Sequence, residues 1–128
     1  MRSARSDAAW RDELEREEAL DLARRIAAFD VPYVAFGRGE PLGVPFCWDI
    51  FDVLASAGVA LKIETDGSRI DDAAADRLAA LAVDCIQISV DGATAQTHER
   101  VRPGSSFEAA TSAMRRLVAR GIPPQFVF

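Results

Sequence analysis

The sequence predicts an α/β fold, a partial (βα) barrel in which about four parallel strands alternate with helices. Short apolar runs rich in β-forming residues alternate with helical patterns of about ten to fifteen residues, which is the order of βαβ units in a parallel sheet. Polar residues also recur at alternate positions of the middle strands. The inside of a barrel accommodates such residues, whereas a sheet packed on both faces does not. The expected strands cover residues 33–36, 59–65, 85–90 and 125–128.

The first two expected helices end at recognisable signals. The first covers residues 12–29, with apolar residues at helical spacing and acidic residues in its first turns. Pro32 ends it, because the residue before a proline is pushed out of the α region. The second helix covers residues 46–57. Pro45 suits its first position, and Gly58 suits the position just after its end.

The last two expected helices have N-terminal capping signals. The third, residues 71–82, begins at an aspartate pair that can cap it. The fourth, residues 105–120, begins with a capping box in which Ser105 and Glu108 are the paired residues. Between the third strand and this helix, residues 91–104 are expected to form a long loop.

The middle strands have one apolar and one polar face, because successive side chains of a strand point to opposite sides. The apolar face of the third strand is expected to meet the helices. Its residues are Ile86, Ile88 and Val90. The polar residues on the two middle strands are Lys62, Glu64, Asp66, Gln87, Ser89 and Asp91.

The composition indicates a globular domain. The chain has 128 residues, of which 49% are hydrophobic and 27% charged, with a net charge of -5, and this balance argues against disorder and against a nucleic-acid partner. No apolar run has the length of a membrane span. The two cysteines, Cys47 and Cys85, suit a reducing compartment. We therefore expect a cytoplasmic protein, with a disordered tail at residues 1–10 and one domain at residues 11–128.

The loop after the first expected strand, residues 37–42, is the first candidate for a binding site. Catalytic and binding groups of α/β proteins lie at the carboxyl ends of parallel strands. Gly37 and Gly39 would let a ligand approach the backbone closely, and Glu40 offers an acceptor for a cationic group such as an amine.

Four motifs in order connect this loop with a known family. The chain reads Gly37-Arg38-Gly39-Glu40-Pro41, then Thr65-Asp66-Gly67, then Ser89-Val90-Asp91-Gly92, then a stretch from Thr94 to Arg102 with His98 inside it. This series resembles the radical S-adenosylmethionine (radical SAM) superfamily, in particular its cofactor-biosynthesis and peptide-modifying branch, whose members often carry SPASM domains. The resemblance covers residues 17–128 and implies that residues 11–128 are a partial radical SAM core domain.

The resemblance also implies the chemistry and the site. In the family, S-adenosylmethionine chelates a [4Fe-4S] cluster, which cleaves it to a 5′-deoxyadenosyl radical that modifies a peptide or a cofactor precursor. Gly39 and Glu40 would receive the methionine amino group. Ser89, with Asp91, would meet the ribose or the carboxylate, and Arg102 would clamp a carboxylate. The implied cofactor-binding positions are Gly37, Gly39, Glu40, Pro41, Ser89, Asp91 and Arg102.

Two departures from the family pattern bear on activity. The C-x3-C-x2-C motif that holds the cluster is absent, because the chain has two cysteines in all. We therefore expect no cluster on this chain and no turnover by the chain alone. Arg38 stands where the family has glycine, and it would cost about 1–2 kcal/mol if its φ angle is positive.

Other interpretations of these residues stay open. The chain could be a degenerate, non-catalytic module that keeps the fold, or a dinucleotide-binding domain, although Gly43 is displaced from the usual third glycine of that motif. Glu40 could pair with Arg38. His98 is interpreted as a loop or helix-start residue, and both cysteines as small buried hydrophobic residues. The first and last strands have open edges, so we expect self-association through them.

Overall fold

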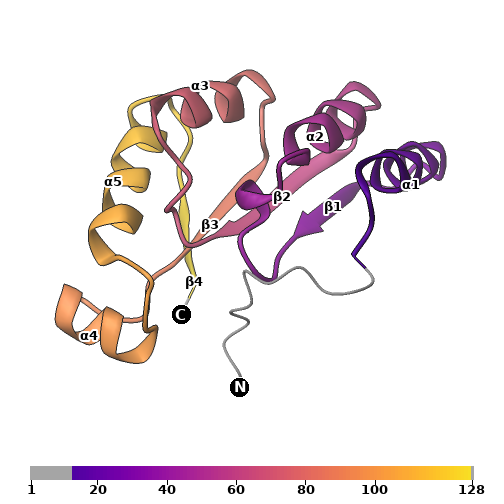
Figure 1. The fold of residues 1–128 in the computed structure, drawn as a ribbon. Helices are drawn as coiled ribbons and strands as arrows, with labels where there is room; N and C mark the ends of the chain where they lie inside the picture. The colour runs from indigo at the N-terminus through magenta and orange to yellow at the C-terminus, as the bar shows by residue number, and fades with distance from the viewer. Residues whose placement is uncertain (1–12, 128) are drawn as a thin grey trace.

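The protein is described by a computed structural model that covers residues 13–127, and the predicted tail at residues 1–10 lies outside the described part. Helices and strands alternate along the chain, as the sequence predicts (Figure 1). The helices are α1 (Arg16–Ala28), the short 3-10 helix η1 (Pro41–Gly43), α2 (Cys47–Ser56), α3 (Asp72–Ala80), α4 (Ala95–Val101) and α5 (Phe107–Val118). The strands are β1 (Tyr33–Phe36), β2 (Ala60–Thr65), β3 (Cys85–Ser89) and β4 (Gln125–Val127).

The four strands form one parallel sheet in the order β1-β2-β3-β4. The register places Glu64 opposite Gln87 and Gln87 opposite Gln125, so the polar residues of neighbouring strands lie side by side. Helices α1, α2, α3 and α5 form an arc along one face of the sheet (Figure 1). Each crossover between neighbouring parallel strands therefore passes through the same layer, as in the wall of a barrel.

The core lies between the sheet and this helical arc. Ile63, Ile86 and Ile88 on the strands are fully buried, whereas Lys62 and Glu64 on the opposite face are exposed. The predicted division into an apolar and a polar face is therefore confirmed. The fully buried large side chains of the core include Phe51, Leu54, Leu61, Ile63, Ile70, Leu78, Ile86, Ile88 and Leu117.

The largest difference from the sequence prediction is α4, which lies where a long loop was expected. Thr94 caps this helix and forms a reciprocal capping box with Thr97. Such a box is usually sought as a serine or threonine followed by an acidic residue or glutamine, and here a second threonine takes that place. With seven residues, α4 is too short to be stable by itself, so its packing against α5 must hold it.

Three predicted helix starts are wrong. The α1 helix begins at Arg16, since Glu15 and Glu18 form its capping box. Pro45 does not begin α2, because Phe46 is the N-cap and the helix starts one residue later. The N-cap of α5 is Ser106, whose side chain accepts a hydrogen bond from the Ala109 amide, whereas Ser105 was expected there. No helix among residues 13–127 is long and apolar enough to cross a membrane.

Candidate functional site at the carboxyl ends of the strands

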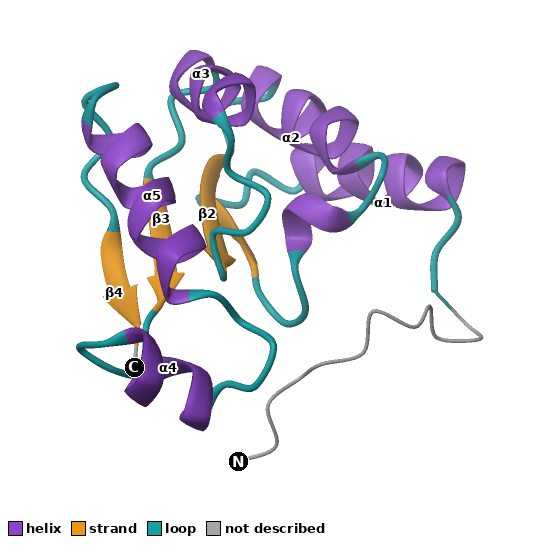
Figure 2. Cartoon of the chain, turned by 60° about the vertical axis from the view of Figure 1, so that its left-hand side comes forward, coloured by secondary structure: helices purple, strands orange, loops and turns teal. Residues whose placement is uncertain are grey.

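The candidate site is built from three loops that leave the carboxyl ends of β1, β2 and β3. These ends lie at one edge of the parallel sheet, and the arrowheads of β3 and β4 point toward α4 in Figure 2. Of the positions that the sequence predicted for cofactor binding, Gly37, Gly39, Glu40 and Pro41 follow β1, Ser89 ends β3, Asp91 follows β3, and Arg102 directly follows α4. The topology therefore brings the predicted residues to the same end of the molecule.

Glu40 connects the first loop to the end of β2. One carboxylate oxygen accepts hydrogen bonds from the Leu42 amide at 3.1 Å and from the Thr65 hydroxyl at 2.9 Å. The other accepts from the Asp66 amide at 2.9 Å, and also lies 2.8 Å from the Thr65 hydroxyl. The Gly67 amide donates to the Thr65 hydroxyl, which directs the hydroxyl proton toward Glu40. The predicted alternative, a pair between Glu40 and Arg38, is not among these contacts.

Glu40 is a partly buried carboxylate that would respond to a nearby charge. The Leu42 and Asp66 amides and the Thr65 hydroxyl bind its two oxygens. Burial raises the pKa of Glu40 to about 7, and the Asp66 side chain raises this pKa further, whereas hydrogen bonds from the Asp66 amide and the Thr65 hydroxyl lower it. An approaching positive charge, such as that of a cationic amine, would favour the ionised form of Glu40.

The first loop has an unusual backbone. Arg38 and Gly39 both have positive φ angles, of 68° and 64°. This left-handed region costs a residue with a side chain about 1–2 kcal/mol and costs glycine almost nothing. A Cβ added at Gly37 would come within 2.9 Å of the Glu64 carboxylate. The expectation of a strained Arg38 is thus met by the geometry of the loop.

A pocket of about 190 Å³ lies beside this loop. Gly37, Arg38 and Pro41 line it. Apolar side chains also line it, and they come from the end of β1, from the residue after η1 and from α2. These residues are Phe36, Val44, Cys47, Ile50 and Phe51. Two of the predicted cofactor-binding residues therefore line a cavity.

The loop after β3 is held by ionic and hydrogen bonds. Ser89 is the last residue of β3, and Asp91 follows two positions later. The Arg102 Nε atom donates to the Asp91 carboxylate at 2.5 Å, with 30% of the Arg102 side chain and 16% of the Asp91 side chain exposed. Arg102, which was predicted to clamp a carboxylate of the cofactor, therefore binds the carboxylate of Asp91 in the same chain.

His98 lies near the start of α4, so the helix-start interpretation of this residue is confirmed and the loop interpretation is wrong. The sequence did not predict that its side chain is fully buried. The Asp91 amide donates to its Nδ1 atom at 3.1 Å, and its Nε2 atom lies 3.1 Å from the hydroxyl of Ser105. The spacing of Thr94 and Thr97 was the signal that could have decided for the helix start over the loop.

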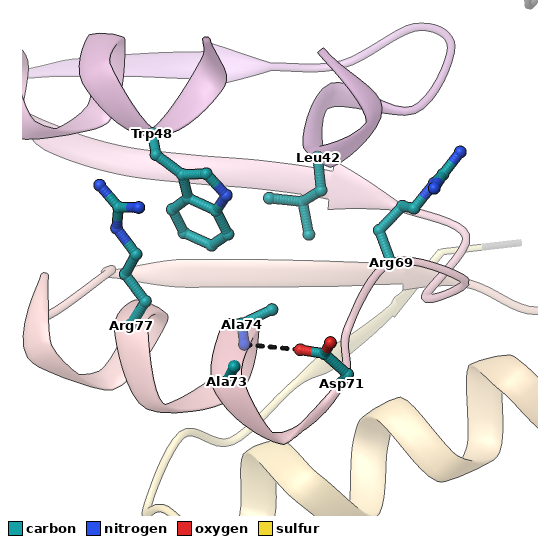
Figure 3. Close-up of a pocket in the computed structure, with 7 residues that line it drawn as sticks. All are labelled: Leu42, Trp48, Arg69, Asp71, Ala73, Ala74 and Arg77. Carbon is teal, nitrogen blue, oxygen red and sulfur yellow. Dashed lines mark hydrogen bonds between the residues drawn. The ribbon is translucent and has the colours of Figure 1, made fainter. Parts of the chain in front are cut away.

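A second pocket, of about 300 Å³, lies between α2 and α3 (Figure 3). Arg77 stacks over the ring of Trp48 at 4.8 Å and also pairs with Asp52, while Asp71 caps α3. Trp48, Asp71 and Arg77 of this pocket therefore already have structural partners. None of the predicted cofactor-binding residues lines it.

A metal site does not form among residues 13–127, where no three histidine, cysteine, aspartate or glutamate residues come together for one. Cys47, the first residue of α2, is buried in the core, as expected for a small hydrophobic residue. Cys85, at the start of β3, is partly exposed, so that expectation is wrong for this cysteine. These residues do not fit a [4Fe-4S] cluster.

Comparison with known proteins decides the family. The model of the radical SAM superfamily matches residues 4–128. The chain belongs to this superfamily. Members of the superfamily use S-adenosylmethionine and a [4Fe-4S] cluster. The resemblance inferred from the ordered motifs is therefore confirmed.

Curated relatives are similar over most of this chain. Mycofactocin maturase MftC of Mycobacterium tuberculosis is 37% identical over 109 residues, which are 85% of this chain and 28% of the relative. MftC of Mycobacterium ulcerans is 38% identical over 109 residues, with 30% of its length covered. An AdoMet-dependent heme synthase of Methanosarcina barkeri is 30% identical over 115 residues, 88% of this chain and 33% of the relative. The chain thus spans less than a third of the length of the MftC relatives.

Solved structures confirm the partial barrel. The structure of native anSMEcpe with bound AdoMet has a TM-score of 0.71 and 18% sequence identity. The matched region is 97% of this chain and 36% of the anSMEcpe chain. The structure of the same protein with bound AdoMet and Kp18Cys peptide has the same TM-score and 19% identity. At this identity the likeness establishes the fold.

Proposed function

We propose that this chain forms the S-adenosylmethionine-binding part of a radical SAM enzyme that modifies a peptide or a cofactor precursor. The observation that carries the proposal is the network of Glu40, which joins the loop after β1 to the end of β2 in a chain of this superfamily. The network fixes a partly buried carboxylate at the edge where the strands end. The names of the MftC relatives and the peptide-bound anSMEcpe structure favour the substrate class.

The residues fit the methionine end of the cofactor. Gly39 and Glu40 would receive the amino group, since no atom crowds the Cα of Gly39 and the carboxylate of Glu40 attracts a cation. Ser89 and Asp91 would meet the ribose or the carboxylate from the end of β3. Arg102 would contribute indirectly, because its Nε atom orients Asp91.

The chain itself does not supply ligands for the cluster, since Cys47 is buried in the core and Cys85 lies on a strand. We therefore assign cofactor binding to this chain and no step of cofactor cleavage. Anaerobic reconstitution with iron and sulfide is expected to yield no stoichiometric [4Fe-4S] absorption. One intact cluster per chain would contradict this assignment.

Calorimetric titration with S-adenosylmethionine tests the proposal. We expect measurable binding by the chain, and an affinity about tenfold lower for Ser89→Ala, which removes a hydrogen bond worth about 1–1.5 kcal/mol. Ser56→Ala is the matched control, because Ser56 ends α2 at the opposite end of the sheet. No binding, or equal affinities for the two variants, would overturn the proposal. Tighter binding of NAD than of S-adenosylmethionine would favour the dinucleotide-binding alternative.

A further inference from the structure

His98 is connected to the candidate site through both of its ring nitrogens. The Asp91 amide can only donate, so Nδ1 must carry the lone pair that accepts its hydrogen bond at 3.1 Å. The buried ring is therefore neutral with its proton on Nε2. This proton then points to the Ser105 hydroxyl at 3.1 Å, and Ser105 is itself buried.

Asp91 is held at two points by the same short helix. Its backbone amide is bound by His98, and its carboxylate is bound by Arg102, the residue that caps the end of α4. His98 and Arg102 are four positions apart, so they lie on the same side of the helix. The Arg102 amide also donates to the His98 carbonyl at 2.8 Å, which fixes their spacing.

Gly92, the next residue, lies directly against the start of α4. A Cβ at this position would clash with the Thr97 hydroxyl and would lie 2.5 Å from the His98 backbone nitrogen. The loop after β3 thus runs in direct contact with the start of α4. The His98 ring, in turn, packs 5.9 Å from the ring of Phe107 on α5.

We infer that His98 is a positioning residue, which fixes the main chain of Asp91 at the end of β3 and thereby, together with Arg102, the direction of the Asp91 carboxylate toward the cofactor. This inference rests on the proposed binding of S-adenosylmethionine by the strand-end loops. It adds that a neutral, Nε2-protonated imidazole, rather than the bulk of the side chain, is what the loop requires.

Two substitutions separate the two ring nitrogens. The amide of asparagine can place its oxygen near the position of Nδ1, whereas the longer glutamine reaches the position of Nε2. We expect His98→Asn to keep slow hydrogen exchange at the Asp91 amide and His98→Gln to speed this exchange about tenfold or more. Ser105→Ala is the matched control, since it removes the partner of Nε2 and leaves the bond at Nδ1.

The unmodified chain provides a measurement that needs no variant to fold. His98 is the single histidine of the sequence, so a long-range ¹H–¹⁵N spectrum reports its tautomer without overlap. We expect the proton on Nε2. A proton on Nδ1, or equal exchange rates of the Asp91 amide in the asparagine and glutamine variants, would overturn the inference.

Binding measurements then relate the position of Asp91 to the cofactor. Titration with S-adenosylmethionine is expected to give a smaller loss of affinity for His98→Asn than for His98→Gln, although both variants lower the melting temperature. Equal losses of affinity would overturn the positioning role. If the unmodified chain does not bind S-adenosylmethionine, the proposed function fails, whereas the tautomer and the amide exchange still test the geometry around Asp91.

Discussion

The loop after β1 and the loop after β3 both lie at the candidate site, but different kinds of contact hold them in place. The first loop is tied down by the single side chain of Glu40, contains the strained Arg38 and borders a pocket. The second loop is held by Arg102 and by the buried His98, and Gly92 leaves no space between it and α4. The difference indicates that the β3 loop is a fixed support, whereas the β1 loop is the part whose shape a single residue can change.

The largest effect is expected from adding a methyl group to the tight loop. Gly92→Ala would place its Cβ 2.5 Å from the His98 backbone nitrogen, and overpacking against backbone should lower the free energy of unfolding by about 3 kcal/mol. Gly43→Ala in the first loop is the matched control, because its Cβ would meet Glu40 at an ordinary 3.7 Å. Urea denaturation of both variants checks this, and similar losses would remove the contrast between the loops.

The second effect is a pH dependence of stability that comes from Glu40, the side chain that holds the first loop. The pKa of Glu40 is raised to about 7 in the folded chain, mainly by burial. Between a pH equal to the ordinary pKa of a glutamate and a pH of about 7, Glu40 is mostly protonated in the folded chain and mostly ionised in the unfolded chain. Folding therefore takes up a proton in this pH range. The resulting contribution to stability is fully present at low pH and is lost as the pH rises through 7.

We expect this contribution to be about 2 kcal/mol and Glu40→Gln to remove most of the corresponding pH dependence. Melting temperatures between pH 4.5 and 8 measure it. Glu64→Gln is the control, since Glu64 is an exposed carboxylate on the neighbouring strand. A Glu40→Gln profile with the same slope as the unmodified chain would show that Glu40 is not the titrating group.

A smaller effect is expected from relieving the backbone strain at Arg38. Arg38→Gly should raise the free energy of unfolding by about 1 kcal/mol, because glycine adopts a φ of 68° without strain. Ala82→Gly, at a φ of 49° after α3, is the control for the backbone effect alone. If Arg38 also obstructs the cofactor, its replacement will raise the affinity for S-adenosylmethionine, and the Ala82 variant will not. Equal calorimetric titrations of the Arg38 variant and the unmodified chain would contradict the obstruction.

The smallest effect concerns β1 and β4, the two outer strands of the sheet. Within residues 13–127, β1 and β4 each pair with one other strand, so we expect weak self-association through a sheet edge. Phe126 on β4 is 57% exposed, and Phe126→Lys should shift the chain toward the monomer in sedimentation at micromolar concentration. Val118→Lys, on α5 and 61% exposed, should leave the distribution unchanged. A monomer in all three cases would contradict association through the edge.

The sequence by itself determined the alternation of strands and helices, the apolar and polar faces of the two middle strands, and the family. These features follow from local patterns. The alternation of Ile86 and Ile88 with Gln87 is set by the two-residue period of a strand, and the four motifs each occupy a few consecutive residues. The exact starts of α1, α2 and α5 were less predictable, because neighbouring residues compete for the same cap.

Only the tertiary structure decided which groups of the site contact one another. Glu40 finds Thr65, twenty-five positions away, because the parallel register of β1 and β2 brings their ends together. Arg102 binds Asp91, rather than standing free for a ligand, because α4 folds back on the end of β3. His98 is buried for the same reason. Such contacts depend on packing between segments that are distant along the chain, and no local pattern encodes which partner a charged or polar side chain will reach.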